Sequence, residues 1–140
     1  MSAILIVDDD PDIRLLLRLE LSAEGHQILE AGDGEEALAL LDREPVELML
    51  LDIMMPVLDG WGVLRRLDPE RSAPVVVVTG MASHNNRHVA ELLELGALDV
   101  IEKPFEPGWL LRLVDAVLLV DDEERAEYRR RRLAHTQRGT

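Results

Sequence analysis

Four short apolar runs in this chain each lead to a polar or charged side chain, and this pattern constrains the fold more than any other feature. The runs cover residues 4–7, 48–51, 75–78 and 100–101. Unbroken apolar runs of this length are typical of strands that are covered on both faces, as in a parallel sheet. The polar residues that come after them are Asp8 and Asp9, Asp52, Thr79 and, beyond Glu102, Lys103.

Between the runs, apolar residues recur at helical spacing. Asp10-Pro11 predicts the start of a first helix, because an acidic N-cap followed by proline is a common helix opening. We expect this helix to end at Gly25 and to bury Ile13, Leu16, Leu17 and Leu21. Further helices are predicted from Asp33 to Pro45, over 61–67 and 86–95, and from Pro107 onward, and further strands over 27–31, 46–51, 74–78 and 99–101.

Strands that alternate with helices through short links predict an α/β fold. The expected architecture is a doubly wound, five-stranded parallel sheet of the flavodoxin-like type, with strand order 2-1-3-4-5 and helices on both faces. In such sheets, ligands bind beyond the carboxyl ends of the strands. The polar residues that follow the apolar runs are therefore predicted to meet at one edge of the sheet.

Composition narrows the classes of protein and partner. The 140 residues suffice for one domain with its own core, and no apolar stretch is long enough to span a bilayer. No basic segment precedes the first strand, so we expect a cytoplasmic protein without a signal peptide. The net charge is −13, of which residues 121–140 contribute +1 and the first 120 residues −14. Such an acidic body disfavours direct binding to nucleic acid or to an anionic membrane.

The predicted edge combines an excess of carboxylates with one unusual cation. Asp8, Asp9 and Asp52 would repel one another unless a cation lay among them, and hard oxygen ligands of this kind suit Mg²⁺. Taken alone, Asp8 and Asp9 fit a solvated turn equally well, and Asp10 fits a simple N-cap. Lys103 is the single lysine among fourteen arginines, and its compact ammonium differs physically from the guanidinium fork.

Residues 1 to about 119 resemble the receiver domain of two-component response regulators. The resemblance rests on motifs that occur in order at the strand ends: Val7-Asp8-Asp9-Asp10, Leu51-Asp52-Ile53-Met54-Met55-Pro56, Asp59-Gly60, Val78-Thr79-Gly80 and Lys103-Pro104-Phe105. It implies a phosphoacceptor signalling protein, not an enzyme in the usual sense. A sensor histidine kinase or phosphotransfer protein would donate the phosphoryl group to Asp52.

The resemblance also assigns roles to the neighbours of Asp52. Asp9, Asp52 and the backbone carbonyl of Met54 would bind Mg²⁺, with Asp8 acting through water or with Lys103. Thr79 would hydrogen-bond a phosphoryl oxygen, and Lys103 would pair with the phosphoryl group. The bond between Lys103 and Pro104 is expected to be cis in this family.

Two departures from the family pattern affect how such a domain would work. Val100 occupies the position, three residues before the lysine, where the family usually has an aromatic switch residue. Met54 and Met81 occupy positions that often tune the lifetime of the phosphoryl group, and neither side chain can orient an attacking water. We therefore expect a long-lived phosphorylated state and a readout that does not use an aromatic rotamer flip.

Two other functions share parts of this pattern. A flavodoxin-like module for a nucleotide or flavin phosphate would have a loop rich in Gly, Ser or Thr after its first strand, whereas this chain has three aspartates there. A phosphatase with an aspartyl nucleophile would need an acid to turn over the intermediate, and Met54 argues against it.

The C-terminal part raises the question of output. We expect a receiver domain over 1–120 and a charged helical extension or tail over 121–140, supported by the i,i+4 pairs Asp121–Arg125 and Glu127–Arg131. About twenty residues are fewer than the roughly 40 that a self-folding module needs, so output would come from a partner in trans. The alternative is that this receiver is a fragment of a longer response regulator or hybrid kinase.

The last helix of the predicted domain has more apolar surface than one buried face can use. From 109 to 120, only Arg112 and Asp115 are polar. Apolar surface of this extent commonly marks an interface. We therefore expect a homodimer through this helix, with the fourth helix and fifth strand alongside it, that depends only modestly on phosphorylation.

Overall fold

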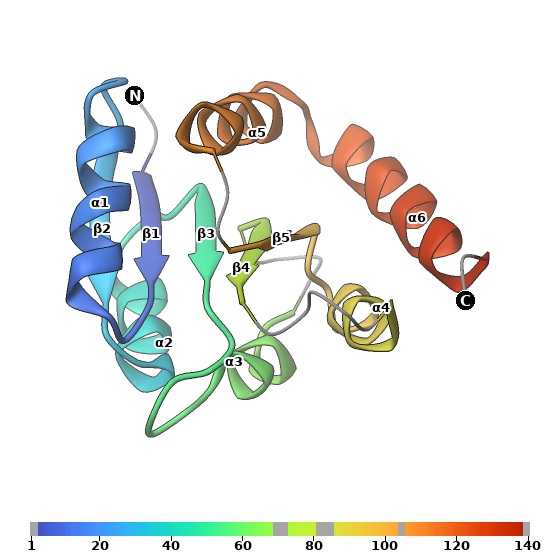
Figure 1. Ribbon diagram of the computed structural model, residues 1–140, viewed down its shortest axis with the longest axis horizontal. Helices are drawn as coiled ribbons and strands as arrows, with labels where there is room; N and C mark the ends of the chain where they lie inside the picture. Colours follow the sequence, from blue (N-terminus) through green and yellow to red (C-terminus); the bar gives the residue numbers. More distant parts are fainter. Residues whose placement is uncertain (1–2, 69–72, 81–85, 104–105, 139–140) are drawn as a thin grey trace.

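The computed structural model describes residues 3–68, 73–80, 86–103 and 106–138. Five parallel strands form one sheet in the order β2-β1-β3-β4-β5, which confirms the predicted architecture (Figure 1). The strands are β1 Ala3–Val7, β2 Gln27–Ala31, β3 Leu48–Leu51, β4 Val75–Thr79 and β5 Asp99–Glu102. The helices are α1 Pro11–Ser22, α2 Gly34–Arg43, α3 Gly60–Arg66, α4 Asn86–Glu94, α5 Pro107–Leu119 and α6 Asp122–Arg138.

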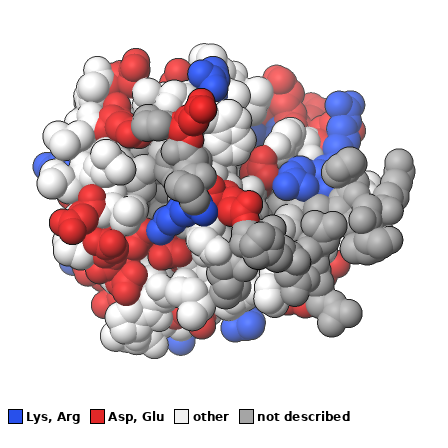
Figure 2. Space-filling view, in the orientation of Figure 1, with Lys and Arg blue, Asp and Glu red and all other residues white. Residues whose placement is uncertain are grey.

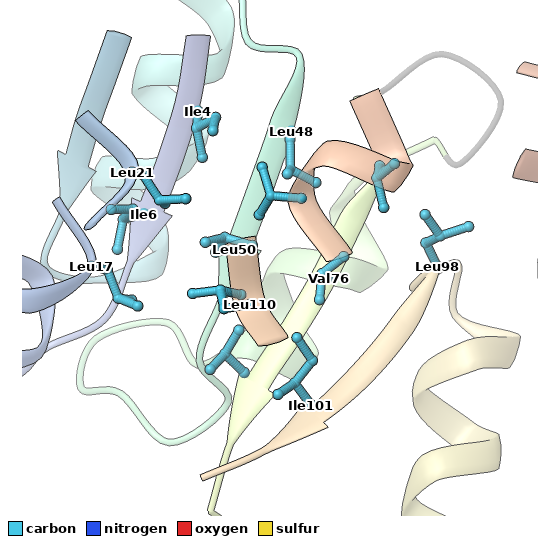
Figure 3. Close-up of a cluster of buried hydrophobic side chains, with 13 residues drawn as sticks. Ile4, Ile6, Leu17, Leu21, Leu48, Leu50, Val76, Leu98, Ile101 and Leu110 are labelled. Carbon is cyan, nitrogen blue, oxygen red and sulfur yellow. The ribbon is translucent and has the colours of Figure 1, made fainter. Parts of the chain in front are cut away.

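Helices cover both faces of the sheet and enclose two apolar cores. On one face, α1 and α5 pack Leu17, Leu21, Leu110, Val114 and Val117 onto β1, β3, β4 and β5 (Figure 3). On the other face, α2, α3 and α4 contribute the second core. The central strands are buried along their whole length, as expected for strands with no solvent-facing side.

The register of the sheet aligns the carboxyl ends of its strands. Val7 is paired with Leu51, and Leu51 with Val77, while Thr79 at the end of β4 is paired with Glu102 at the end of β5. The residues that follow these positions therefore leave the sheet at a common edge, as predicted.

The first three helices, α1, α2 and α3, each follow an aspartate that accepts a backbone hydrogen bond. Asp10 accepts from the N–H of Asp12, Asp33 from that of Glu36, and Asp59 from that of Gly62, each at 2.9 Å. These bonds satisfy donors that the first turn of a helix would otherwise leave unpaired. The predicted capping role of Asp10 is confirmed.

The predicted burial of Leu16 in α1 is wrong. Leu17 and Leu21 are buried and Ile13 is partly buried, but Leu16 is 52% exposed. Leu15, Leu16 and Leu17 are consecutive, so helical spacing alone does not decide which of them faces the core. The strand predicted over 46–51 also begins later, at Leu48.

Most of the C-terminal segment forms helix α6, Asp122–Arg138. Glu127 pairs with Arg131 at 3.0 Å, as predicted. Arg125 pairs with Asp122 instead of Asp121, because the Asp121 side chain caps α6 by accepting from the Glu124 N–H at 2.8 Å. Among the described residues, no helix combines the length and apolar character that crossing a bilayer requires.

Candidate functional site

The carboxyl edge of the sheet brings Asp8 and Asp52 together with Lys103. The Lys103 ammonium donates to Asp8 Oδ2 at 2.8 Å and lies 3.6 Å from Asp52 Oδ2. Asp8 and Asp52 are both buried, and Lys103 is partly buried. Residues 95 positions apart in the chain therefore form one ion cluster beyond the ends of β1, β3 and β5.

Backbone contacts fix the two buried carboxylates in place. Asp52 donates its backbone N–H to the Val7 carbonyl at 2.9 Å, and Asp52 Oδ1 accepts from the Ile53 N–H at 2.8 Å. Asp8 Oδ1 accepts from the Asp10 N–H at 2.9 Å. One oxygen of each carboxylate is thus held by the backbone, while the other faces Lys103.

Burial and neighbouring charge raise the pKa of Asp52. The largest cause is desolvation of the carboxylate, and the negative charges of Asp8 and, more weakly, Asp9 act in the same direction. Lys103 and the Ile53 N–H oppose the shift without cancelling it. Asp52 is therefore an anion that its surroundings stabilise incompletely.

Lys103 is held in its charged form. Desolvation acts to lower the pKa of Lys103, but the hydrogen bond to Asp8 and the charges of Asp52 and Asp8 outweigh it and raise the pKa. The ammonium remains a positive charge at neutral pH, placed between two carboxylates. Lys103, the single lysine of the chain, therefore has a specific place between the two carboxylates, in line with its singular occurrence in the sequence.

Three carboxylates at this edge could share a cation. Asp8, Asp9 and Asp52 each offer an oxygen, and these oxygens all lie within 4.8 Å of one another. Asp9 is exposed, whereas Asp8 and Asp52 are buried, so the group opens to solvent on one side. Hard oxygen donors with one open side fit Mg²⁺, which keeps part of its water shell.

Two further predicted residues lie at the same edge. Thr79 is buried at the end of β4, and its carbonyl accepts the backbone N–H of Lys103 at 3.0 Å. Met54 follows Ile53, two residues after Asp52, and its side chain is 64% exposed. Met81 and Pro104 lie outside the described residues.

The loop between β3 and α3 approaches Asp52 more closely than the sequence pattern indicated. The N–H of Gly60 donates to the Ile53 carbonyl at 2.8 Å. A Cβ on Gly60 would lie 2.5 Å from the Asp52 carbonyl oxygen and 2.7 Å from the Ile53 Cα. Only glycine fits here, which gives the Asp59-Gly60 motif a physical reason.

Contacts of Asp8 and Asp52 with the rest of the chain were not foreseen. Arg14 in α1 donates to the Asp8 carbonyl at 2.6 Å and also pairs with Glu30 at 3.2 Å, so it links β1, α1 and β2 behind the site. The sequence did offer one signal for the contacts of Arg14, because an arginine on the buried side of a helix needs polar partners. The Ile53 N–H bond to Asp52 left no signal, because any residue supplies that donor.

Comparison with known sequences places the chain in a family. Residues 4–115 match the response regulator receiver domain. The chain belongs to this family. It is therefore a receiver domain of two-component signalling, and the family resemblance read from the motifs is confirmed.

Relatives of the receiver domain include regulators of transcription. It is 43% identical over 115 residues to the probable transcriptional regulator ycf27 of Porphyridium aerugineum, covering 82% of this chain and 47% of that protein. It is also 43% identical over 118 residues to the transcriptional regulatory protein CpxR of Klebsiella pneumoniae, covering 84% of this chain and 50% of that protein. The chain spans about half the length of these curated relatives.

Solved receiver domains share the fold. The receiver domain of the Francisella response regulator 1452 superposes with a TM-score of 0.77 at 28% identity, covering 84% of this chain and 97% of that one. The residues that match the family, 4–115, include the carboxylates Asp8, Asp9 and Asp52 and also Lys103. Val100, at the position where the family usually has the aromatic switch residue, is aliphatic. It lies in β5 and packs against the core on the side of α2, α3 and α4.

Proposed function

We propose that this receiver domain accepts one phosphoryl group on Asp52 from the phosphohistidine of a sensor histidine kinase or a phosphotransfer protein. The observation that carries the proposal is the Asp8–Lys103–Asp52 cluster, in which a buried carboxylate with a raised pKa lies 3.6 Å from an ammonium. Groups with perturbed pKa values at a sheet's carboxyl edge are candidates for chemistry.

The transfer moves a phosphoryl group from nitrogen to oxygen. An Asp52 oxygen attacks phosphorus and the P–N bond breaks. The imidazole of the donor, already protonated on its other nitrogen, leaves as a neutral ring with the electron pair of that bond. Oδ2 is the expected nucleophile, because Oδ1 is already held by the Ile53 N–H. Lys103 then pairs with a phosphoryl oxygen, and Thr79, at the end of β4, donates to another. Phosphoryl transfer depends mainly on such positioning and charge neutralisation.

The donor set fits Mg²⁺. Asp8, Asp9 and Asp52 would hold the ion, with the Met54 carbonyl completing the protein ligands. When bound, Mg²⁺ neutralises negative charge on the carboxylates and on the phosphoryl oxygens. Asp9, exposed at the open side, is placed to bind the ion, while Asp8 keeps its contact with Lys103.

Acetyl phosphate with Mg²⁺ tests the assignment without a cognate kinase. Intact-mass measurement should show one adduct per chain, dependent on the divalent cation, and none on Asp52→Asn. Lys103→Arg should respond poorly, because the guanidinium fork does not fit the compact site of the ammonium. An adduct that persists on Asp52→Asn would overturn the assignment.

The phosphorylated form should be long-lived. Neither Met54 nor Met81 can hold a water in line with phosphorus. Replacing Met54 with Asn and Met81 with Glu should speed the loss of the phosphoryl group, measured as decay of the adduct after the donor is removed. Equal decay in both proteins would place control of water access elsewhere.

Output requires a downstream effector outside the receiver domain. The relatives are about twice as long as the matched segment and are regulators of transcription. The effector is either a partner in trans or, if this chain is part of a longer response regulator or hybrid kinase, a further domain. The body, with a charge of −14 over its first 120 residues, does not favour direct DNA contact by the receiver domain itself.

A further inference from the structure

Helix α6 is fastened to the receiver domain at one buried carboxylate. Asp99, the first residue of β5, accepts hydrogen bonds from the Tyr128 hydroxyl and, at 3.0 Å, from Arg132 Nε. It also accepts from the Val100 N–H at 2.8 Å. Tyr128 and Arg132 are four residues apart, so one face of α6 supplies both side-chain donors. This Asp99 clamp is a specific attachment.

Helices α5 and α6 diverge from a short connection. α6 packs against α4, and Figure 1 shows α5 and α6 separating from their junction. The connection consists of Val120 and Asp121. Arg125 closes it by donating to the carbonyls of Val117 at 3.1 Å and Val120 at 3.0 Å.

An apolar groove remains open between the diverging helices. It has a volume of about 580 Å³. Its apolar lining comes from Leu98, Leu113, Ala116, Val117 and Val120, with Tyr128 on the α6 side. Leu119, next to the connection, is 86% exposed. α6 therefore covers α4 and the start of β5, which lie on the side predicted for self-association, but leaves the apolar side of α5 uncovered.

We propose that two copies of this chain associate by exchanging α6, so that the Asp99 of each copy binds the α6 of the other. The surface formed by α4 and Asp99 is complementary to α6, as the contacts described above show. A second copy of the chain carries the same helix and can therefore supply it. Short connections of this kind favour exchange of the element that follows them. Because both connections then lie near the two-fold axis, the groove and Leu119 of each copy meet those of the other.

Charge supports a second copy as the occupant. The first 120 residues carry −14, whereas Arg129 to Arg132 make the second half of α6 strongly basic. Figure 2 shows basic side chains at the edge where α6 lies, beside a surface with many acidic side chains, and the Lys or Arg residues of α6 are all arginines. An arginine-rich helix that approaches another acidic body is attracted to it, which offsets repulsion between the two bodies.

Charge reversal on two separate chains tests the exchange. One 140-residue chain carries Asp99→Lys and the other Arg132→Glu, so neither can form the clamp within itself or with its own kind. In an exchanged heterodimer, one clamp is native and the other is restored with reversed charges. Native mass spectrometry with one chain isotope-labelled should show a heterodimer fraction at least tenfold above either homodimer, because both clamps carry opposite charges in the heterodimer and neither does in a homodimer.

The control replaces a neighbouring arginine that does not contact Asp99. The Arg131 side chain is largely exposed and pairs with Glu127, so Arg131→Glu changes the same charge on α6 and leaves the clamp intact. Mixed with Asp99→Lys, it should give no excess of heterodimer. Circular dichroism and formation of the Asp52 adduct verify that each chain is folded.

A second variant keeps the test decisive if a reversed chain does not fold. Asp121→Ala removes the α6 cap and favours one continuous helix through the connection. Its dimer fraction in sedimentation at tens of micromolar should exceed that of the parent severalfold. Folded chains that stay monomeric in the mixture, or an Asp121→Ala protein no more dimeric than the parent, would overturn the exchange.

Discussion

Asp52 and Asp99 are both buried carboxylates of the same sheet, but they lie at opposite edges and have opposite surroundings. Asp52, beyond the carboxyl end of β3, shares its space with Asp8 and Asp9, and its pKa is raised. Asp99, at the amino end of β5, accepts from Val100, Tyr128 and Arg132. Asp99 is satisfied by donors from β5 and α6. Asp52, in contrast, lies in an excess of negative charge that a cation or a reaction would relieve.

The difference indicates how chemistry and attachment can be told apart. A buried charge with enough donors stabilises one arrangement of the chain. A buried charge among like charges costs free energy unless a ligand completes its surroundings. On this basis the carboxyl edge is the reacting site and the Asp99 clamp is a docking contact.

The largest effect is expected from Gly60→Ala, which tests how tightly the reacting edge is built. Its Cβ would lie 2.5 Å from the Asp52 carbonyl oxygen, which is backbone and cannot move away cheaply. We expect a loss of about 3 kcal/mol in the free energy of unfolding, measured by urea denaturation. Gly80→Ala is the matched control, since its Cβ meets nothing within 4 Å, and a similar loss there would contradict the argument.

Removing the ammonium from the acidic cluster should have the next largest effect. Lys103→Met leaves Asp8 and Asp52 buried without their shared cation, and we expect a loss of about 2 kcal/mol. Mg²⁺ should raise the melting temperature of this variant more than that of the parent. Arg112→Met, which removes an exposed cation from α5, serves as the control. An unchanged free energy of unfolding in Lys103→Met would show that Lys103 does not offset a repulsion between Asp8 and Asp52.

Much of the reacting edge could be predicted from the sequence because the pattern there is local. Strand ends and N-caps are set by neighbouring residues, so Asp8, Asp52, Thr79 and Lys103 were placed at one edge correctly. Asp99 was assigned only to a strand. Its partners Tyr128 and Arg132 lie 29 and 33 residues further on, in a helix whose packing site no local pattern indicates.

The exposed position of Leu16 in α1 and the docking of α6 onto Asp99 were not predicted, for related reasons. Because residues 15, 16 and 17 are all leucines, the sequence does not show which of them faces the core. Leu16 was therefore predicted to be buried, although it is half exposed. The polar α6 has little apolar periodicity, so its sequence predicted a solvated helix. The arginines there were counted as surface charges, and only the folded chain shows that Arg132 reaches the sheet.

A smaller effect should come from Val57 in the loop that leads from Asp52 to α3. Its φ of 69° lies in the left-handed region, which is unfavourable for a β-branched residue, and its side chain is 80% exposed. Val57→Gly should stabilise the protein by about 1 kcal/mol, since glycine adopts this φ freely. Val57→Ala keeps a Cβ and should gain less in the same denaturation experiment. An equal gain would show that the backbone strain is not the cause.

The smallest effect concerns Tyr128, the single tyrosine of the chain. Burial first, and then the hydrogen bond to Asp99, raise its pKa to about 12. The neutral hydroxyl is therefore favoured when α6 is docked. Its contribution is complete below the ordinary pKa of about 10 and is lost as the pH rises through about 12. Titration of tyrosinate absorbance should report this value and a lower one in Asp99→Asn, while equal values would contradict the clamp.

Phosphorylation of Asp52→Asn and Asp99→Asn, measured in parallel, tests the contrast between the two edges most directly. Each variant replaces one buried carboxylate of the sheet with its amide. Both proteins are incubated with acetyl phosphate and Mg²⁺ and read by intact mass, beside the parent. We expect no adduct on Asp52→Asn and a single adduct of parental extent on Asp99→Asn. An adduct on Asp52→Asn, or its loss from a folded Asp99→Asn protein, would contradict the account.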